Sequence, residues 1–177
     1  MSDEELFKRT LDWEAKFNEK EKERDYSRYD ALCALYLDAT PEQRSRLPYI
    51  LAPEDTAAYE NRIGGLIVYM RWNAKRIKTP EDAYPLRLGL AAAAILEERL
   101  DSRDIGTSLA FLYHAAKQVG LDPVPHFIEI ADMARPQTRQ FILQFLDWSE
   151  ADIESTVAAY SGYLNAQNLP YKEIELN

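Results

Sequence analysis

Four carboxylates lie close together near residue 100, at Glu97, Glu98, Asp101 and Asp104. A group of carboxylates can bind a hard cation or take part in acid–base catalysis. These four fall at the junction of two predicted helices, where Asp101 and Asp104 also suit the exposed amides and the positive end of a helix start. Helix capping accounts for half of the group, so a structural role is favoured over a catalytic one.

A second set of polar residues predicts either a packing surface or one wall of a pocket. Arg87, Ala91, Ala94 and Glu98 share one narrow helix face at spacings i, i+4, i+7 and i+11. Small residues between two charges form a flat surface whose end charges reach solvent or pair with neighbours. His114 lies opposite the apolar stripe of the following helix, where a solvated histidine is the simplest interpretation. The candidate binding residues are therefore Arg87, Glu97, Glu98, Asp101 and His114, and no residue is assigned a catalytic role.

No metal or cofactor site is predicted. His126, Glu129 and Asp132 spread over about 120° of a helix, which is too wide for all three to reach one ion. His126 and Glu129 are instead expected to form a surface pair. The chain has no GxxxxGK[ST], GxGxxG, HExxH, CxxC or GxSxG motif. Cys33 falls on an apolar stripe and is predicted to be a small core residue.

The candidate residues are positioned by two helices predicted within residues 85–123. The apolar run Leu88–Leu96 is far shorter than the roughly 20 residues that a bilayer requires, so it predicts a buried central helix. The second helix is amphipathic. It is expected to start at Asp101 or Ser102 and to stop at Gly120.

The rest of the chain shows the apolar periodicity of further helices. A capping box at Ser2 and Glu5 predicts the start of the first one. Gly64 and Gly65 either bend a long helix or admit a close neighbour. Later helices are expected at Ser27–Asp38, from Thr40 to a point before Pro48, at Pro53–Ile77, at Pro123–Ala134, at Gln137–Trp148 with Phe141, Phe145 and Trp148 facing inward, and after a cap at Ser149.

These helices predict an all-α fold in a single domain over residues 1–177. The favoured architecture is an irregular bundle of about eight helices. The alternative is a short, α-solenoid-like stack of helical hairpins, because successive helices are joined by only a few residues. Residues 170–177 form either a loose tail or an extended segment docked on the bundle.

Composition narrows the class of partner. The chain has 177 residues, of which 46% are hydrophobic, and a formal net charge of −9. Nucleic acid is not expected as a direct ligand, because phosphate binding requires a basic surface. An acidic surface instead suits encounter with a basic protein. The acidic start, MSDEELFKRT, lacks the features of a secretion signal, so a cytoplasmic location without membrane contact is expected. The oligomeric state stays open.

Three functions are weighed. The favoured one is a non-enzymatic protein-interaction module, such as an immunity-type or inhibitor protein, an antitoxin-like partner or an adaptor. It fits the absence of catalytic motifs and the 11 tyrosines, which serve well as interface anchors. The alternatives are a small enzyme or ligand-binding protein with a polar pocket between helices, and an acidic mimic of nucleic acid.

Overall fold

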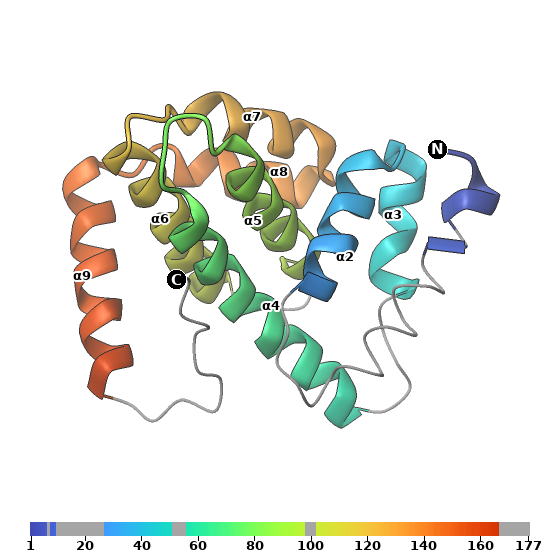
Figure 1. Ribbon diagram of the computed structural model, residues 1–177, viewed down its shortest axis with the longest axis horizontal. Coiled ribbons are helices and arrows are strands. Elements are labelled where there is room, and N and C mark those ends of the chain that lie inside the picture. Colours follow the sequence, from blue (N-terminus) through green and yellow to red (C-terminus); the bar gives the residue numbers. More distant parts are fainter. Residues whose placement is uncertain (7, 10–26, 51–55, 98–101, 167–177) are drawn as a thin grey trace.

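The computed structural model describes residues 1–6, 8–9, 27–50, 56–97 and 102–166, and within these ranges the chain is helical with no strand. The prediction of an all-α fold is confirmed (Figure 1). The helices are α2 (Ser27–Asp38), α3 (Pro41–Ile50), α4 (Thr56–Arg76), α5 (Ala83–Leu96), α6 (Ser102–Gln118), α7 (Val124–Met133), α8 (Pro136–Phe145) and α9 (Glu150–Ala166).

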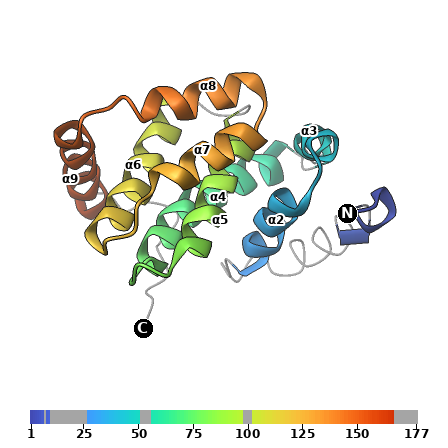
Figure 2. The same ribbon diagram turned by 90° about the horizontal axis from the view of Figure 1, so that it is seen from above.

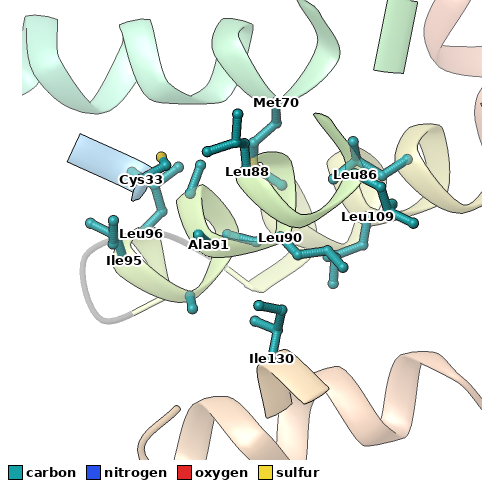
Figure 3. Packing of buried hydrophobic residues seen from close by; sticks show 14 of the residues in the cluster. Cys33, Met70, Leu86, Leu88, Leu90, Ala91, Ile95, Leu96, Leu109 and Ile130 are labelled. Carbon is teal, nitrogen blue, oxygen red and sulfur yellow. The ribbon is translucent and has the colours of Figure 1, made fainter. Parts of the chain in front are cut away.

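Helix α5 is the centre of the fold, as its apolar sequence predicts. Every residue from Leu88 to Leu96 is buried. Met70 of α4 and Ile130 of α7 approach α5 from opposite sides (Figure 3), and α2 and α6 also pack on it. In a stack of hairpins each helix packs on helices one or two places away in the chain. The contacts of α2 with α5 and of α6 with α9 join helices three places apart, so the fold is a bundle.

Glycine allows two pairs of these helices to approach very closely. A Cβ at Gly65 of α4 would lie 2.8 Å from Cζ of Tyr29 of α2. A Cβ at Gly89 of α5 would lie 2.7 Å from Cδ2 of Leu112 of α6. Both distances are shorter than van der Waals contact, so neither position has room for a side chain. Gly65 thus admits a close neighbour, which is one of the two roles predicted for it.

A partly buried polar cluster joins α2 to α4 beside this contact. The Tyr69 hydroxyl donates to Asp30 at 2.5 Å, and Arg76 donates to both Asp30 and Asn73 at 2.9 Å. Burial, with the Asp30 charge second, raises the pKa of the neighbouring Cys33 thiol. Cys33 is fully buried, which confirms it as a core residue.

The amino-terminal residues pack back onto α2. The Glu5 amide donates to the Ser2 hydroxyl at 3.1 Å, which confirms the predicted cap. Leu6 is buried in the core, and Arg9 pairs with Asp38 at 3.1 Å.

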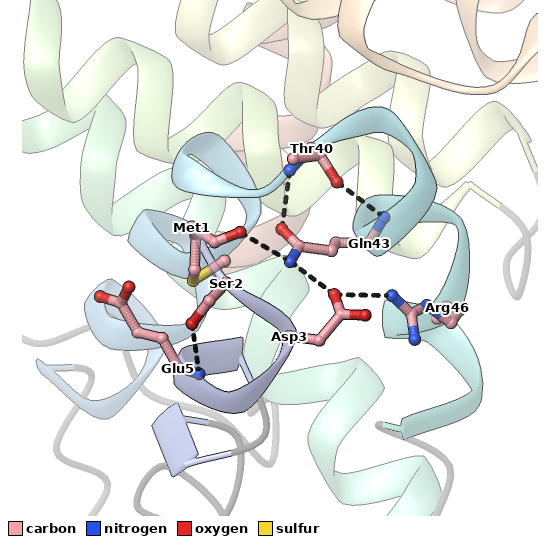
Figure 4. A network of polar contacts seen from close by, with 7 residues as sticks. All are labelled: Met1, Ser2, Asp3, Glu5, Thr40, Gln43 and Arg46. Atoms are coloured by element: carbon pink, nitrogen blue, oxygen red, sulfur yellow. Dashed lines mark hydrogen bonds and ion pairs between the residues drawn. The ribbon is translucent and has the colours of Figure 1, made fainter.

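Helix α3 is tied to the same amino-terminal residues through Gln43 (Figure 4). Thr40 and Gln43 form a reciprocal capping box, with hydrogen bonds of 3.0 and 3.2 Å between side chains and amides. The Gln43 amide group also donates to the Met1 carbonyl and to Asp3. Arg46 donates to the same Asp3 oxygen at 3.1 Å. The hydrogen bond from Gln43, followed by the one from Arg46, lowers the pKa of Asp3.

The end of α6 follows the prediction. Gly120 has a φ of +79°, a left-handed conformation that glycine adopts without strain. The Leu121 amide donates to the Ala116 carbonyl at 3.0 Å, closing the helix as a glycine cap does.

Two predicted helix ends are wrong. Helix α3 continues to Ile50 through Pro48, because a proline in the last turn removes only one backbone hydrogen bond. Helix α8 ends at Phe145 and not at Trp148. The amides of residues 146–148 bond to carbonyls three residues earlier, and this tighter winding turns Trp148 off the inward face. Trp148 is 40% exposed, whereas Phe145 is buried as predicted.

Other predictions fall outside the described residues. They concern the alternative cap at Asp101 and the tail at residues 170–177. The buried apolar residues form one continuous cluster from Leu6 to Ile153, while the single-domain assignment itself stays a prediction. None of the described helices combines the length and apolar character needed to cross a bilayer.

Candidate functional site

The structure places Arg87 against α7. Its Nη2 donates to Oε1 of Glu129 at 2.7 Å, with both side chains partly exposed. Glu129, which was expected to pair with His126, therefore pairs with Arg87. The pair joins the amino-terminal part of α5 to the middle of α7, so Arg87, a predicted binding residue, has a structural role.

Glu97 lies at the other end of α5 and contacts a different helix. Its Oε2 accepts a hydrogen bond from the Thr138 hydroxyl of α8 at 2.7 Å. Glu98 and Asp101, which were predicted to act with it, lie outside the described residues. Of the four carboxylates near residue 100, Glu97 is thus the one whose side chain is described.

His114 lies in a third place, on α6 facing α9. It lines a surface groove of about 210 Å³ between the two helices. The groove is lined by Tyr113, His114, Lys117 and Gln118 of α6 and by Glu150, Ile153 and Glu154 of α9. Among the candidates whose side chains are described, Arg87 is bonded to α7, Glu97 is bonded to α8, and His114 lines the groove beside α9, so the three do not form one polar pocket.

The groove lies beside a concentration of negative charge. Asp147, Glu150, Asp152 and Glu154 are all exposed and lie in the turn after α8 and the first turns of α9. We call these four carboxylates, together with Trp148, the acidic corner. Glu150 and Glu154 are one helical turn apart and both line the groove, so two carboxylates of the corner face the same space.

Local structure holds the acidic corner in place. The Ser149 hydroxyl accepts from the Asp152 amide at 3.1 Å and caps α9, as predicted. Acidic residues in the first turn favour the positive end of the helix. Ile153 is buried and anchors α9 to α6. The Trp148 ring rests on Phe145 with ring centres 4.9 Å apart, and its outer edge lies against Gly106.

One cation of the groove neutralises part of this charge. Lys117 Nζ lies 3.4 Å from Glu150 Oε1, with the two side chains 47% and 69% exposed. Exposed ion pairs of this kind contribute about 0 to 1 kcal/mol, because solvent screens them and holding two long side chains costs entropy. The lysine can therefore move away at little cost when another cation enters.

This arrangement can bind a cationic group. Among the described side chains, no three His, Cys, Asp or Glu residues come together in a way that could hold a metal ion. The groove presents two carboxylates, an imidazole and an amide at a surface. These groups accept and donate hydrogen bonds, which suits the head group of a lysine or an arginine.

Sequence reasoning identified His114 but missed the residues across from it. Within the run Ser149–Glu154, SEADIE, the sequence-based prediction uses only Ser149, as a helix cap. Trp148 was expected to face inward. The sequence signal that could have identified this site is the high density of carboxylates next to Trp148. What the sequence does not show is that α9 lies beside His114.

The chain matches no protein-family model, no curated protein and no solved structure.

Proposed function

We propose that this protein is a non-enzymatic interaction module that binds a basic protein through the acidic corner and the adjoining groove. The observation that carries the proposal is the pairing of Glu150 and Glu154 on one side of a groove, with the exposed Trp148 two residues before Glu150 in the chain. A lysine or arginine of the partner enters the groove between the two carboxylates. Trp148 packs against the apolar residues that flank it.

The chemistry of the corner suits recognition of a basic surface. Tryptophan is enriched among the residues that dominate binding energy at interfaces. Here its ring is held by Phe145 before the partner arrives, so little side-chain entropy is lost on binding. Exposed carboxylates add long-range attraction that raises the association rate and weakens with salt. The net charge of −9 acts in the same direction.

The finer role that we propose is that of an immunity-type or inhibitor protein. Such a protein works by occupying a basic surface of its target and needs no catalytic group of its own. The expected partner is a basic protein, bound in the cytoplasm. Its association should be fast at low salt and should weaken strongly as salt rises.

A pull-down with charge-matched baits tests the proposal. The first bait carries Glu150→Gln and Glu154→Gln. The control bait carries Glu4→Gln and Glu81→Gln, which change the net charge equally at exposed positions away from the groove. We expect the wild type and the control to capture one stoichiometric basic protein at low salt, and the corner bait to lose it.

Three results would contradict the proposal. The first is equal loss of the partner from both double variants, since net charge alone would then account for binding. The second is a partner that the corner bait retains at wild-type amounts. The third is capture of an acidic protein with binding that resists salt, which would argue against a basic target.

A further inference from the structure

The groove between α6 and α9 already holds one cation, the ammonium of Lys117. Helix α9 packs on α6 at one end of the molecule (Figures 1 and 2), and carboxylates of α9 and polar side chains of α6 line the same groove. Lys117 Nζ lies 3.4 Å from Glu150 Oε1. Charge-assisted hydrogen bonds between nitrogen and oxygen are shorter, at about 2.7 to 2.9 Å. The ammonium is therefore held by charge and not by a short, directed hydrogen bond.

Glu154 is the second carboxylate of the groove, and it forms no ion pair within the part of the chain that the structure describes. Its side chain is exposed and lies one helical turn after Glu150. Both oxygens of an ionised carboxylate accept hydrogen bonds, and a guanidinium can donate to the two at once through a planar fork. An ammonium is a point charge that lacks this planar fork.

The rest of the lining adds neutral acceptors and apolar surface. The Tyr113 hydroxyl and the Gln118 amide group supply acceptor oxygens. Ile153 and the Tyr113 ring supply apolar surface, and that ring is held by edge contacts with Phe127 and Phe145. A guanidinium has more N–H donors than an ammonium and is more weakly hydrated. It can therefore use these acceptors and lie on this apolar surface, whereas an ammonium keeps its hydration.

We propose that the cationic group selected by this groove is the guanidinium of an arginine. The inference rests on the proposed function and narrows its partner to a basic protein that presents an exposed arginine. The guanidinium forms its forked pair of hydrogen bonds with Glu154, and its other donors reach the neutral acceptors of α6. A lysine of the partner gains only the kind of charge contact that Lys117 already makes with Glu150.

Titration followed by amide NMR shifts tests this preference on the full chain with three capped amino acids. Nα-acetyl-arginine amide should bind saturably, with shifts centred on residues 113–118 and 150–154. Nα-acetyl-lysine amide has the same charge, and we expect it to bind about three- to tenfold more weakly, because it cannot form the forked pair. Nα-acetyl-citrulline amide has nearly the shape of the arginine probe without its charge. It should bind at least about tenfold more weakly than that probe.

The outcomes separate this inference from the proposed function. Equal affinities for the arginine and lysine probes, with shifts in the groove, would overturn the preference and leave the binding of a basic partner standing. Equal affinities for the arginine and citrulline probes would overturn both, because the groove would then not respond to charge. The absence of saturable shifts in the groove with any probe would also overturn both.

A substitution of one carboxylate sharpens the test. Glu154→Gln should bring the ratio of the arginine and lysine affinities close to one, because it removes the acceptor of the forked pair. The side chain is exposed, so the unfolding midpoint should stay unchanged. Glu81→Gln makes the same change in net charge at an exposed position outside the groove and should leave both affinities unchanged. A preference for arginine that survives Glu154→Gln would contradict the proposed contact.

Discussion

Helices α5 and α9 differ most clearly in how much of their surface is buried by other helices. Leu88 through Leu96 of α5 are buried on all sides, between α2, α4, α6 and α7. Helix α9 packs mainly on α6 through Ile153 and Val157, and it exposes most of its other described side chains. The first helix carries little charge, whereas the second begins with closely spaced carboxylates. The residues that determine the fold and those that we propose for binding are therefore separate, and each set can be changed without the other.

The largest expected difference is in stability. Leu88→Ala should lower the free energy of unfolding by about 2 to 5 kcal/mol, because it leaves a cavity in a fully buried site. Val157→Ala on α9 should lower it by about 1 kcal/mol, since that side chain is only partly buried. Chemical denaturation measures both values. Equal losses would show that α9 is as integral to the core as α5.

A pair of glycine substitutions sharpens the comparison. Gly65→Ala should destabilise the protein by about 1 to 3 kcal/mol, because the added methyl group overlaps the Tyr29 ring. Gly106→Ala should instead stabilise it by up to about 1 kcal/mol. Its Cβ would meet the Trp148 ring at an ordinary 3.6 Å while the helix gains alanine's propensity. Thermal unfolding of the two variants side by side gives the sign of each effect. A stabilising Gly65→Ala would contradict the close packing of α2 on α4.

Substitution in the groove should change binding and not stability. Lys117→Gln removes the cation beside Glu150 and makes the groove more negative. We expect a several-fold gain in affinity for the basic partner, corresponding to about 1 kcal/mol, with an unchanged unfolding midpoint. Titration calorimetry and a denaturation curve measure the two effects. A loss of affinity would mean that Lys117 itself contacts the partner.

The smallest expected effect depends on pH and lies at the start of α5. The amides of Lys78 and Thr79 donate to one oxygen of Asp82 at 2.8 and 2.9 Å, and these bonds lower the pKa of Asp82. A lowered pKa in the folded state gives stability that is present above the ordinary carboxyl range, near pH 4, and is lost as pH falls through the lowered pKa. Asp82→Ala should therefore lower the melting temperature at pH 7 but not at the acid end of the transition. Glu81→Ala, at an exposed neighbouring position, is the control and should show no such pH dependence.

Most of the fold could be predicted from the sequence because its signals are local. The apolar run of α5, the glycine after α6 and the caps at Ser2 and Ser149 depend on residues a few positions apart. The wrong helix ends have a local cause that composition does not reveal. A change from α-helical to tighter hydrogen bonding after Phe145 is enough to expose Trp148.

The candidate site was only partly predictable, because it depends on contacts between distant segments. Arg87 has the spacing of a pocket residue, yet it forms an ion pair with Glu129 of α7. His114 was identified, but its neighbours Glu150 and Glu154 follow it by more than 30 residues. Periodicity shows which face of a helix is polar. It does not show which helix lies opposite.

Site-specific photo-crosslinking in the source cell tests the central claim most directly. A photoreactive phenylalanine analogue would replace Ala151, an exposed residue of the acidic corner's helix, or Tyr84, an exposed aromatic residue of α5. We predict a covalent adduct with one basic protein from position 151 and none from position 84. An adduct from position 84 alone, or the same protein captured equally from both positions, would contradict binding at the acidic corner.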